Sequence, residues 1–193
     1  MATSTLSPIL TGTSKPDAMT ETKTTLRLLV TPYCNRSCPG CCNQDWELDT
    51  LPAVRSFEKY SKICLTGWEP MLFSFMLLYI AKQIRQENDA PIIVYSAKTD
   101  SLTAWERVLH KLDGATITLH EERDVESFLR LNSFLRSRPD LTRDKSLRLN
   151  VFKGISLDGI DLSLWKVKEN MTWIRDCPLP DNEEFLRWED LSR

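Results

Sequence analysis

Three cysteines stand close together in the first quarter of the chain, at Cys34, Cys38 and Cys41. Their C-x3-C-x2-C spacing lets one short loop present three thiolates to one side of an iron–sulfur cluster. Three irons of a [4Fe–4S] cubane would then have a protein ligand, and the fourth would keep an open coordination position. Because an open position is where chemistry can occur, the spacing predicts a catalytic cluster held from a single loop.

The same residues leave a structural zinc site as an alternative. Closed zinc sites take four protein ligands, usually as two separated pairs. Cys42 follows the third cysteine directly, but no later C-x2-C or H-x3-H pair exists in the chain. A non-catalytic zinc-binding module is therefore the weaker interpretation. We interpret Cys42 as a thiol outside the cluster, Cys64 as a small core residue and Cys177 as an isolated residue near the end.

The elements that must position these cysteines follow from the alternation of apolar runs with amphipathic stretches, which is typical of βα units. The sequence predicts an α/β fold with parallel strands near 25–31, 62–66, 91–96, 115–120, 146–152 and 171–175. Predicted helices cover 51–60, 71–86, 102–112, 125–136 and 162–169, with a short C-terminal helix from Asp181. Active sites of such folds lie at the carboxyl edge of the sheet, and the cysteines follow the first strand there.

The bulk composition is that of an ordinary globular protein. With 193 residues, of which 41% are hydrophobic and 27% charged, the chain is long enough for one buried core. The formal net charge of −2 gives no signal for nucleic acid. We expect a single domain over 25–193, preceded by a disordered tail over 1–24 that is rich in Ser and Thr.

The cysteine distribution and the hydropathy bear on the location of the protein. Four of the six cysteines fall between Cys34 and Cys42, which is a poor layout for a secreted disulfide framework. No apolar run reaches the roughly 18 residues that a membrane span needs. We therefore expect reduced thiols, a cytoplasmic location and no membrane partner.

Two segments of the chain resemble the motifs of the radical SAM superfamily. One is Cys-Asn-Arg-Ser-Cys-Pro-Gly-Cys over 34–41, and the other is Leu-Thr-Gly-Trp-Glu-Pro over 65–70. The resemblance implies a partial (βα)6 parallel barrel in which Cys34, Cys38 and Cys41 ligate a [4Fe–4S] cluster. It also implies reductive cleavage of S-adenosyl-L-methionine to a 5′-deoxyadenosyl radical, which takes hydrogen from a small-molecule or nucleotide-like substrate. The electron would come from an external low-potential donor, flavodoxin or ferredoxin.

The resemblance also implies which residues contact the cofactor. Gly67, Trp68 and Glu69 match the Gly-Gly-Glu segment that holds the methionine amino group, with Trp68 in place of the second glycine. Ser96 and Asn150 occupy positions from which this family often hydrogen-bonds the ribose or the carboxylate of the cofactor.

One further candidate follows from strand alternation. Thr116, Thr118 and His120 share one face of a predicted strand, so His120 at its end is expected to reach the cofactor or substrate cavity. Arg148 shares a face with Asn150 on the next strand and is a candidate for meeting a carboxylate.

An activating enzyme for a glycyl radical protein is the alternative within the same chemistry. The Cys-Pro-Gly-Cys sequence, followed by Asn43 and Trp46, is similar to the cluster loop of the activating enzymes of anaerobic ribonucleotide reductase. Gly40 stands where the superfamily commonly has an aromatic residue. The similarity does not extend beyond this loop, so the chain is first interpreted as an enzyme acting on a small molecule.

Overall fold

The alternating apolar runs of the sequence form parallel strands, as predicted. The structure, a computed structural model, describes residues 24–174 and 176–189. Its strands are β1 (Thr24–Leu29), β2 (Tyr60–Thr66), β3 (Ile92–Ser96), β4 (Gly114–Leu119), β5 (Ser146–Phe152), β6 (Lys166–Met171) and β7 (Glu183–Arg187). They make one sheet in the order β6-β5-β4-β3-β2-β1-β7, and every pairing is parallel.

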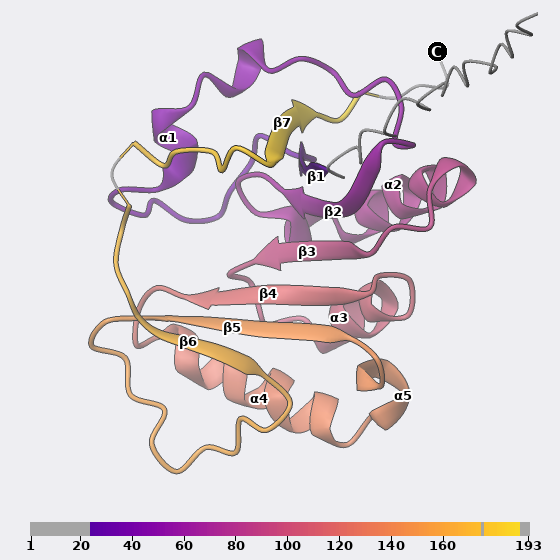
Figure 1. The fold of residues 1–193 in the computed structure, drawn as a ribbon. Coiled ribbons are helices and arrows are strands. Elements are labelled where there is room, and N and C mark those ends of the chain that lie inside the picture. The colour runs from indigo at the N-terminus through magenta and orange to yellow at the C-terminus, as the bar shows by residue number, and fades with distance from the viewer. Residues whose placement is uncertain (1–23, 175, 190–193) are drawn as a thin grey trace, which may run out of the picture.

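The longer helices cover one face of this sheet (Figure 1). The helical segments are α1 (Cys42–Asp45), η1 (Leu48–Thr50), η2 (Pro70–Phe73), α2 (Ser74–Glu87), α3 (Leu102–Leu109), α4 (Asp124–Arg136) and α5 (Pro139–Thr142). In Figure 1, α2, α3 and α4 lie behind the strands, whereas no helix of the described residues lies in front of them. The sheet therefore has one covered face and one uncovered face.

The hydrophobic core lies between the sheet and the helices. In β1 to β5, alternate residues point toward the helices and are buried, as Leu28, Leu65, Val94, Ile117 and Leu149 are. The helices contribute Ile80, Trp105 and Phe128, which are also fully buried. Burial of apolar area contributes about 25 cal/mol per Å² to folding, so this layer holds the strand ends in place.

The fold class is confirmed at the level of a parallel α/β sheet. The first five predicted strands match β1 to β5, and the predicted helices over 71–86, 102–112 and 125–136 match η2 with α2, α3 and α4. The sixth predicted strand, over 171–175, is displaced toward the C-terminus relative to the observed strand β6, which spans 166–171. The sheet also has a seventh strand that the sequence did not predict.

The predicted helix over 51–60 is wrong. This segment runs extended beside β7: Arg187 donates its backbone N–H to Pro52, and Val54 donates to Arg187. Val54 and Phe57 are fully buried there. Pairing with a distant strand therefore overrides the local helical signal of Thr50 and Pro52.

The two predicted C-terminal helices are wrong as well. The residues over 162–169 enter β6 at Lys166, and the segment from Asp181 forms β7 instead of a helix. β7 pairs with β1 from Thr25↔Glu183 to Leu29↔Arg187.

The predicted N-terminal tail falls mostly outside the described residues, because the description begins at residue 24. Residues 190–193 at the other end of the chain lie outside it as well. No helix in the described ranges is long and apolar enough to cross a membrane.

Candidate functional site

The carboxyl ends of β1 to β4 converge on one cavity of about 240 Å³. Eight of the predicted site residues line it, namely Cys34, Cys38, Cys41, Gly67, Trp68, Glu69, Ser96 and His120, whereas Asn150 and Arg148 do not. The cysteine loop follows β1, the Gly-Trp-Glu segment follows β2, and Ser96 and His120 stand at the ends of β3 and β4. The order of the parallel strands thus brings together residues that are up to 86 positions apart in the sequence.

The cysteine loop is tied to the opposite side of the cavity by Arg36. Its guanidinium forms a bidentate ion pair with Asp124, in which Nη1 donates to Oδ2 at 2.9 Å and Nη2 donates to Oδ1. Nη2 also donates to the carbonyl of Ala97 at 3.3 Å. Asp124 additionally accepts the backbone N–H groups of His120 and Glu121. This network connects the loop to the ends of β3 and β4.

The three thiols differ in burial. Cys38 is buried, whereas Cys34 and Cys41 are half-buried. Burial is the main cause that raises the pKa of both Cys34 and Cys38, so these thiols are neutral at neutral pH. In the part of the chain that the structure describes, no three Cys, His, Asp or Glu residues are gathered closely enough to hold a single metal ion.

Gly67 has a backbone conformation that other residues rarely adopt. Its φ is +131°, and a Cβ at this position would lie 2.7 Å from the carbonyl oxygen of Thr31. The next residue, Trp68, donates its backbone N–H to the same carbonyl at 3.3 Å. Trp68 is not among the residues with positive φ. The backbone therefore accommodates a tryptophan at this position without a positive φ.

Replacing Gly67 by alanine is expected to destabilise the protein by about 1–3 kcal/mol, because the Cβ would press on the Thr31 carbonyl and force the chain off this φ. Gly154→Ala is the matched control, since Gly154 also has positive φ, at +93°, but no atom lies within 4 Å of an added Cβ. The free energy of unfolding should be measured in urea. An equal loss in both variants would show that the contact with Thr31 has no role.

Glu69 is a buried carboxylate directly beside the cavity, with 1% of its surface exposed. It accepts hydrogen bonds from the Ser96 hydroxyl at 2.6 Å and from the backbone N–H groups of Ala97 at 2.9 Å and Met71 at 3.0 Å. Burial raises the pKa of Glu69, although these hydrogen bonds favour its ionised form. Ser96 in this structure therefore orients Glu69.

His120 forms part of an aromatic wall. Its ring stacks on Trp173 with a centroid distance of 5.0 Å and an interplanar angle of 6°, and it contacts Phe152 at 4.8 Å. Burial lowers the pKa of His120, and the nearby Arg36 acts in the same direction, so the imidazole is neutral at pH 7. Its buried Nδ1 has no hydrogen-bond partner in the described structure. This nitrogen is available to a ligand.

Asn150 does not line the cavity. It lies on the uncovered face of β5, where its Nδ2 donates to Thr118 Oγ1 at 3.4 Å. Thr118 does line the cavity, so Asn150 is connected to the cavity only through its contact with Thr118.

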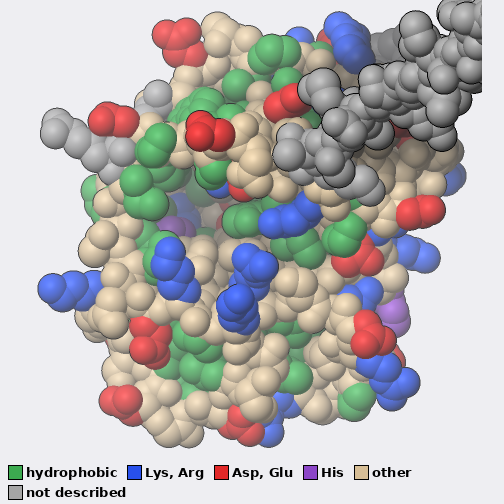
Figure 2. Space-filling view, in the orientation of Figure 1, with side chains coloured by type: hydrophobic (Ala, Val, Ile, Leu, Met, Phe, Trp, Pro, Cys, Tyr) green, Lys and Arg blue, Asp and Glu red, His purple; other side chains and the backbone are tan. Residues whose placement is uncertain are grey.

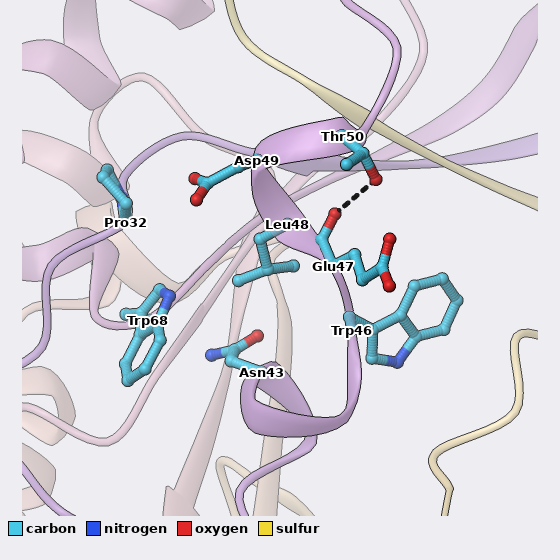
Figure 3. A pocket seen from close by; sticks show the side chains of 8 residues that line it. All are labelled: Pro32, Asn43, Trp46, Glu47, Leu48, Asp49, Thr50 and Trp68. Atoms are coloured by element: carbon cyan, nitrogen blue, oxygen red, sulfur yellow. Dashed lines mark hydrogen bonds between the residues drawn. The ribbon is translucent and has the colours of Figure 1, made fainter.

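A second and larger hollow of about 510 Å³ adjoins the cysteine cavity (Figure 3). Asn43, Trp46 and Trp68 line both. Figure 3 shows the Asn43 carboxamide directed toward the Trp68 indole, and Asn43 Nδ2 donates to the Gly67 carbonyl at 3.1 Å. Trp68 thus forms the border between the two hollows.

Sequence reasoning missed the contribution of Trp173. This residue comes from the segment between β6 and β7 and lies against Gly40, where an added Cβ would be 3.0 Å from its Cγ atom. Because Gly40 has no side chain and a φ of +84°, the indole can approach the cysteine loop closely. The glycine before the third cysteine was a signal for such a contact, but no pattern in the sequence points to Trp173 as the partner.

The interpretation of Cys177 as an isolated residue is wrong. Cys42 and Cys177 form a disulfide across 135 residues, with their Cα atoms 5.4 Å apart. The expectation of reduced thiols throughout therefore fails for this pair. Cys64 is buried, as expected for a core residue, and its sulfur is 3.9 Å from the Tyr95 hydroxyl. The disulfide attaches the segment that carries Trp173 to the start of α1.

Thiol counting tests this disulfide. In cluster-free protein purified without reductant and then denatured, iodoacetamide is expected to label only the four free cysteines, namely Cys34, Cys38, Cys41 and Cys64. Prior reduction should raise the number to all six. Peptide mapping by mass spectrometry distinguishes these results. Labelling of Cys42 and Cys177 without reduction would contradict the pairing.

No protein-family model matches this chain, and no curated protein matches it either.

Proposed function

We propose that the chain is a radical SAM enzyme that acts on a small molecule. The observation that carries the proposal is the convergence of Cys34, Cys38 and Cys41 with the Gly67–Glu69 segment on one cavity at the carboxyl edge of a parallel sheet. A cavity at this edge is the usual ligand site of parallel α/β folds. The partial (βα)6 parallel barrel that the resemblance implies is part of the same proposal.

The three cysteines that line the cavity offer one thiol to each of three irons of a [4Fe–4S] cluster. Each cysteine of a cubane binds a different iron, so the thiols must surround a volume instead of meeting at one point. Cys34, Cys38 and Cys41 all line the same cavity. When bound there together with S-adenosyl-L-methionine, the cluster would supply the electron for reductive cleavage to the 5′-deoxyadenosyl radical.

The cavity wall supplies groups for binding the methionine and adenosine parts of the cofactor. The Glu69 carboxylate is suited to a cationic amino group, because a cation beside it would favour the ionised form that burial disfavours. The neutral His120 offers its unpartnered Nδ1 to a ligand. Trp173 and Phe152, which stack around His120, would keep water away from the reacting atoms.

Exposed aromatic side chains near the cysteine loop favour a second candidate, an activase for a glycyl radical protein. Tyr33, directly before Cys34, is 64% exposed and packs on Phe73 with a centroid distance of 5.9 Å. Phe75, two residues farther along, is 71% exposed. Such side chains are typical of protein contacts. Stable co-purification with a large glycyl radical enzyme would favour this candidate.

Metal analysis tests the proposed cofactor. After anaerobic reconstitution with iron and sulfide, the full chain is expected to hold about four irons and four sulfides, with the visible absorption of a cluster. Uptake of one zinc ion per chain, with no sulfide, would instead identify a zinc-binding module. Both outcomes are measured by elemental and sulfide analysis of the same purified protein.

A further inference from the structure

Three basic side chains stand together on the uncovered face of the sheet. The parallel register pairs Thr116 with Arg148 and Arg148 with Lys166, and Asn150 with Lys168. Because paired residues of neighbouring strands share a face, Arg148, Lys166 and Lys168 lie on the side of Thr116 that no described helix covers. Figure 2 looks onto this face and shows Lys and Arg side chains gathered over its middle.

These cations have no partners of their own. Arg148, Lys166 and Lys168 are exposed, and within residues 24–174 and 176–189 their side chains have no ion pair and no hydrogen bond. On the same face, Arg27 is neutralised by an ion pair with Glu183. Neighbouring strands are about 4.8 Å apart, where like charges destabilise a sheet. In a chain with a net charge of −2, this local excess of positive charge favours an anionic ligand.

A buried hydroxyl on the same face points to the same conclusion. Thr116 is 3% exposed, and its Oγ1 has no hydrogen-bond partner in the described structure. Leaving such a group without a partner costs about 1–3 kcal/mol. Thr116 is the register partner of Arg148. An oxygen-rich ligand held by Arg148 would supply the hydroxyl with a partner.

The basic group, defined as Arg148, Lys166 and Lys168, is connected to the cysteine cavity along β4. Thr118 and His120, which follow Thr116 on the same face, both line that cavity. With a rise of about 3.3 Å per residue, His120 lies roughly 13 Å from Thr116. A molecule anchored at the basic group would therefore have to be about the size of a nucleotide to reach the cavity.

We infer that the substrate carries a phosphate or polyphosphate group, which Arg148, Lys166 and Lys168 bind. The planar guanidinium of Arg148 suits bidentate binding of phosphate, and two lysines add the charge that a multiply ionised group needs. The inference names the substrate class for the proposed enzyme and rests on that function for the reaction, but the binding of the anion does not depend on it.

Calorimetric titration of the full chain with sodium tripolyphosphate tests the inference. The double variant Arg148→Gln/Lys168→Gln is expected to bind on the order of 100-fold more weakly, because it removes two charge-assisted contacts. Lys82→Gln/Lys111→Gln is the matched control, since it removes two exposed charges from α2 and the turn after α3. Its affinity should stay within about twofold of the wild type. Should the double variant not fold, Lys166→Gln alone should weaken binding about tenfold.

Several results would overturn the inference. One is that the wild type does not bind tripolyphosphate, and another is that the double variant and the control lose the same affinity for it. The others are that citrate binds as tightly as tripolyphosphate, or that a single-stranded oligonucleotide binds more tightly. The titration needs neither an iron–sulfur cluster nor S-adenosyl-L-methionine. Its failure would therefore leave the proposed reaction untouched, and a failure of that reaction would leave the anion site standing.

Discussion

Replacing Cys38 by alanine is expected to abolish both cluster assembly and the formation of 5′-deoxyadenosine. Cys38 is the middle cysteine of the loop and the buried one of the three, and it faces the shared cavity. Without it, two thiolates remain for a cluster that needs three, and an iron exposed to solvent is readily lost. Iron and sulfide content and product chromatography on the reconstituted variant measure the effect.

Cys64→Ala is the matched control for this experiment. Cys64 is also a buried free cysteine, but it lies within β2 and does not line the cavity. Its removal should leave the iron content and the product yield close to those of the wild type. Retention of a cluster or of product by Cys38→Ala, or equal losses in both variants, would contradict the ligand assignment.

The second large effect is expected from Asp124→Ala. Asp124 is 2% exposed and neutralises Arg36, whose side chain is 15% exposed. Removing one partner of a buried ion pair leaves an uncompensated charge, which typically costs about 3–5 kcal/mol. The loop that carries the three cysteines would also lose its attachment to the ends of β3 and β4. Urea unfolding of the cluster-free protein measures the loss of stability.

The control removes both charges at once. Arg36→Met/Asp124→Leu leaves no unpaired charge, so it is expected to be more stable than Asp124→Ala. If the double variant were the less stable of the two, the ion pair would not be the reason for the loss.

The same ion pair predicts a pH dependence. Burial by itself would raise the pKa of Asp124, but the hydrogen bonds from Arg36 and from two backbone N–H groups lower it overall. A carboxyl whose pKa is lowered in the folded state adds stability above its ordinary pKa of about 3.9 and loses it as the pH falls further. The wild type should therefore lose stability in acid more steeply than Arg36→Met/Asp124→Leu.

The covered layer of the fold could be predicted from the sequence because its signals are local. β2 to β5 are short segments rich in apolar and β-branched residues, and α4 begins at an acidic residue and has a regular apolar stripe. β7 could not be predicted in this way. The segment over 183–187 becomes a strand only because β1 offers it an unpaired edge, and that edge is formed by residues about 158 positions earlier.

The candidate site likewise has parts that local sequence patterns predict and parts that depend on distant residues. The cysteine spacing and the Gly-Trp-Glu segment are short patterns, and strand order explains why Ser96 and His120 lie beside them. Trp173 and Cys177 were not predictable, because their partners Gly40 and Cys42 lie far away in the sequence. Arg36 lies within the cysteine motif itself. A charged residue in such a loop indicates an oppositely charged partner, which in the structure is Asp124.

The central claim is tested most directly by incubating the reconstituted, reduced full chain with S-adenosyl-L-methionine under anaerobic conditions and measuring 5′-deoxyadenosine. The proposed function predicts that this nucleoside accumulates with the wild type and is absent without reductant. A sample that holds its full complement of iron and sulfide, and still releases none, would contradict it.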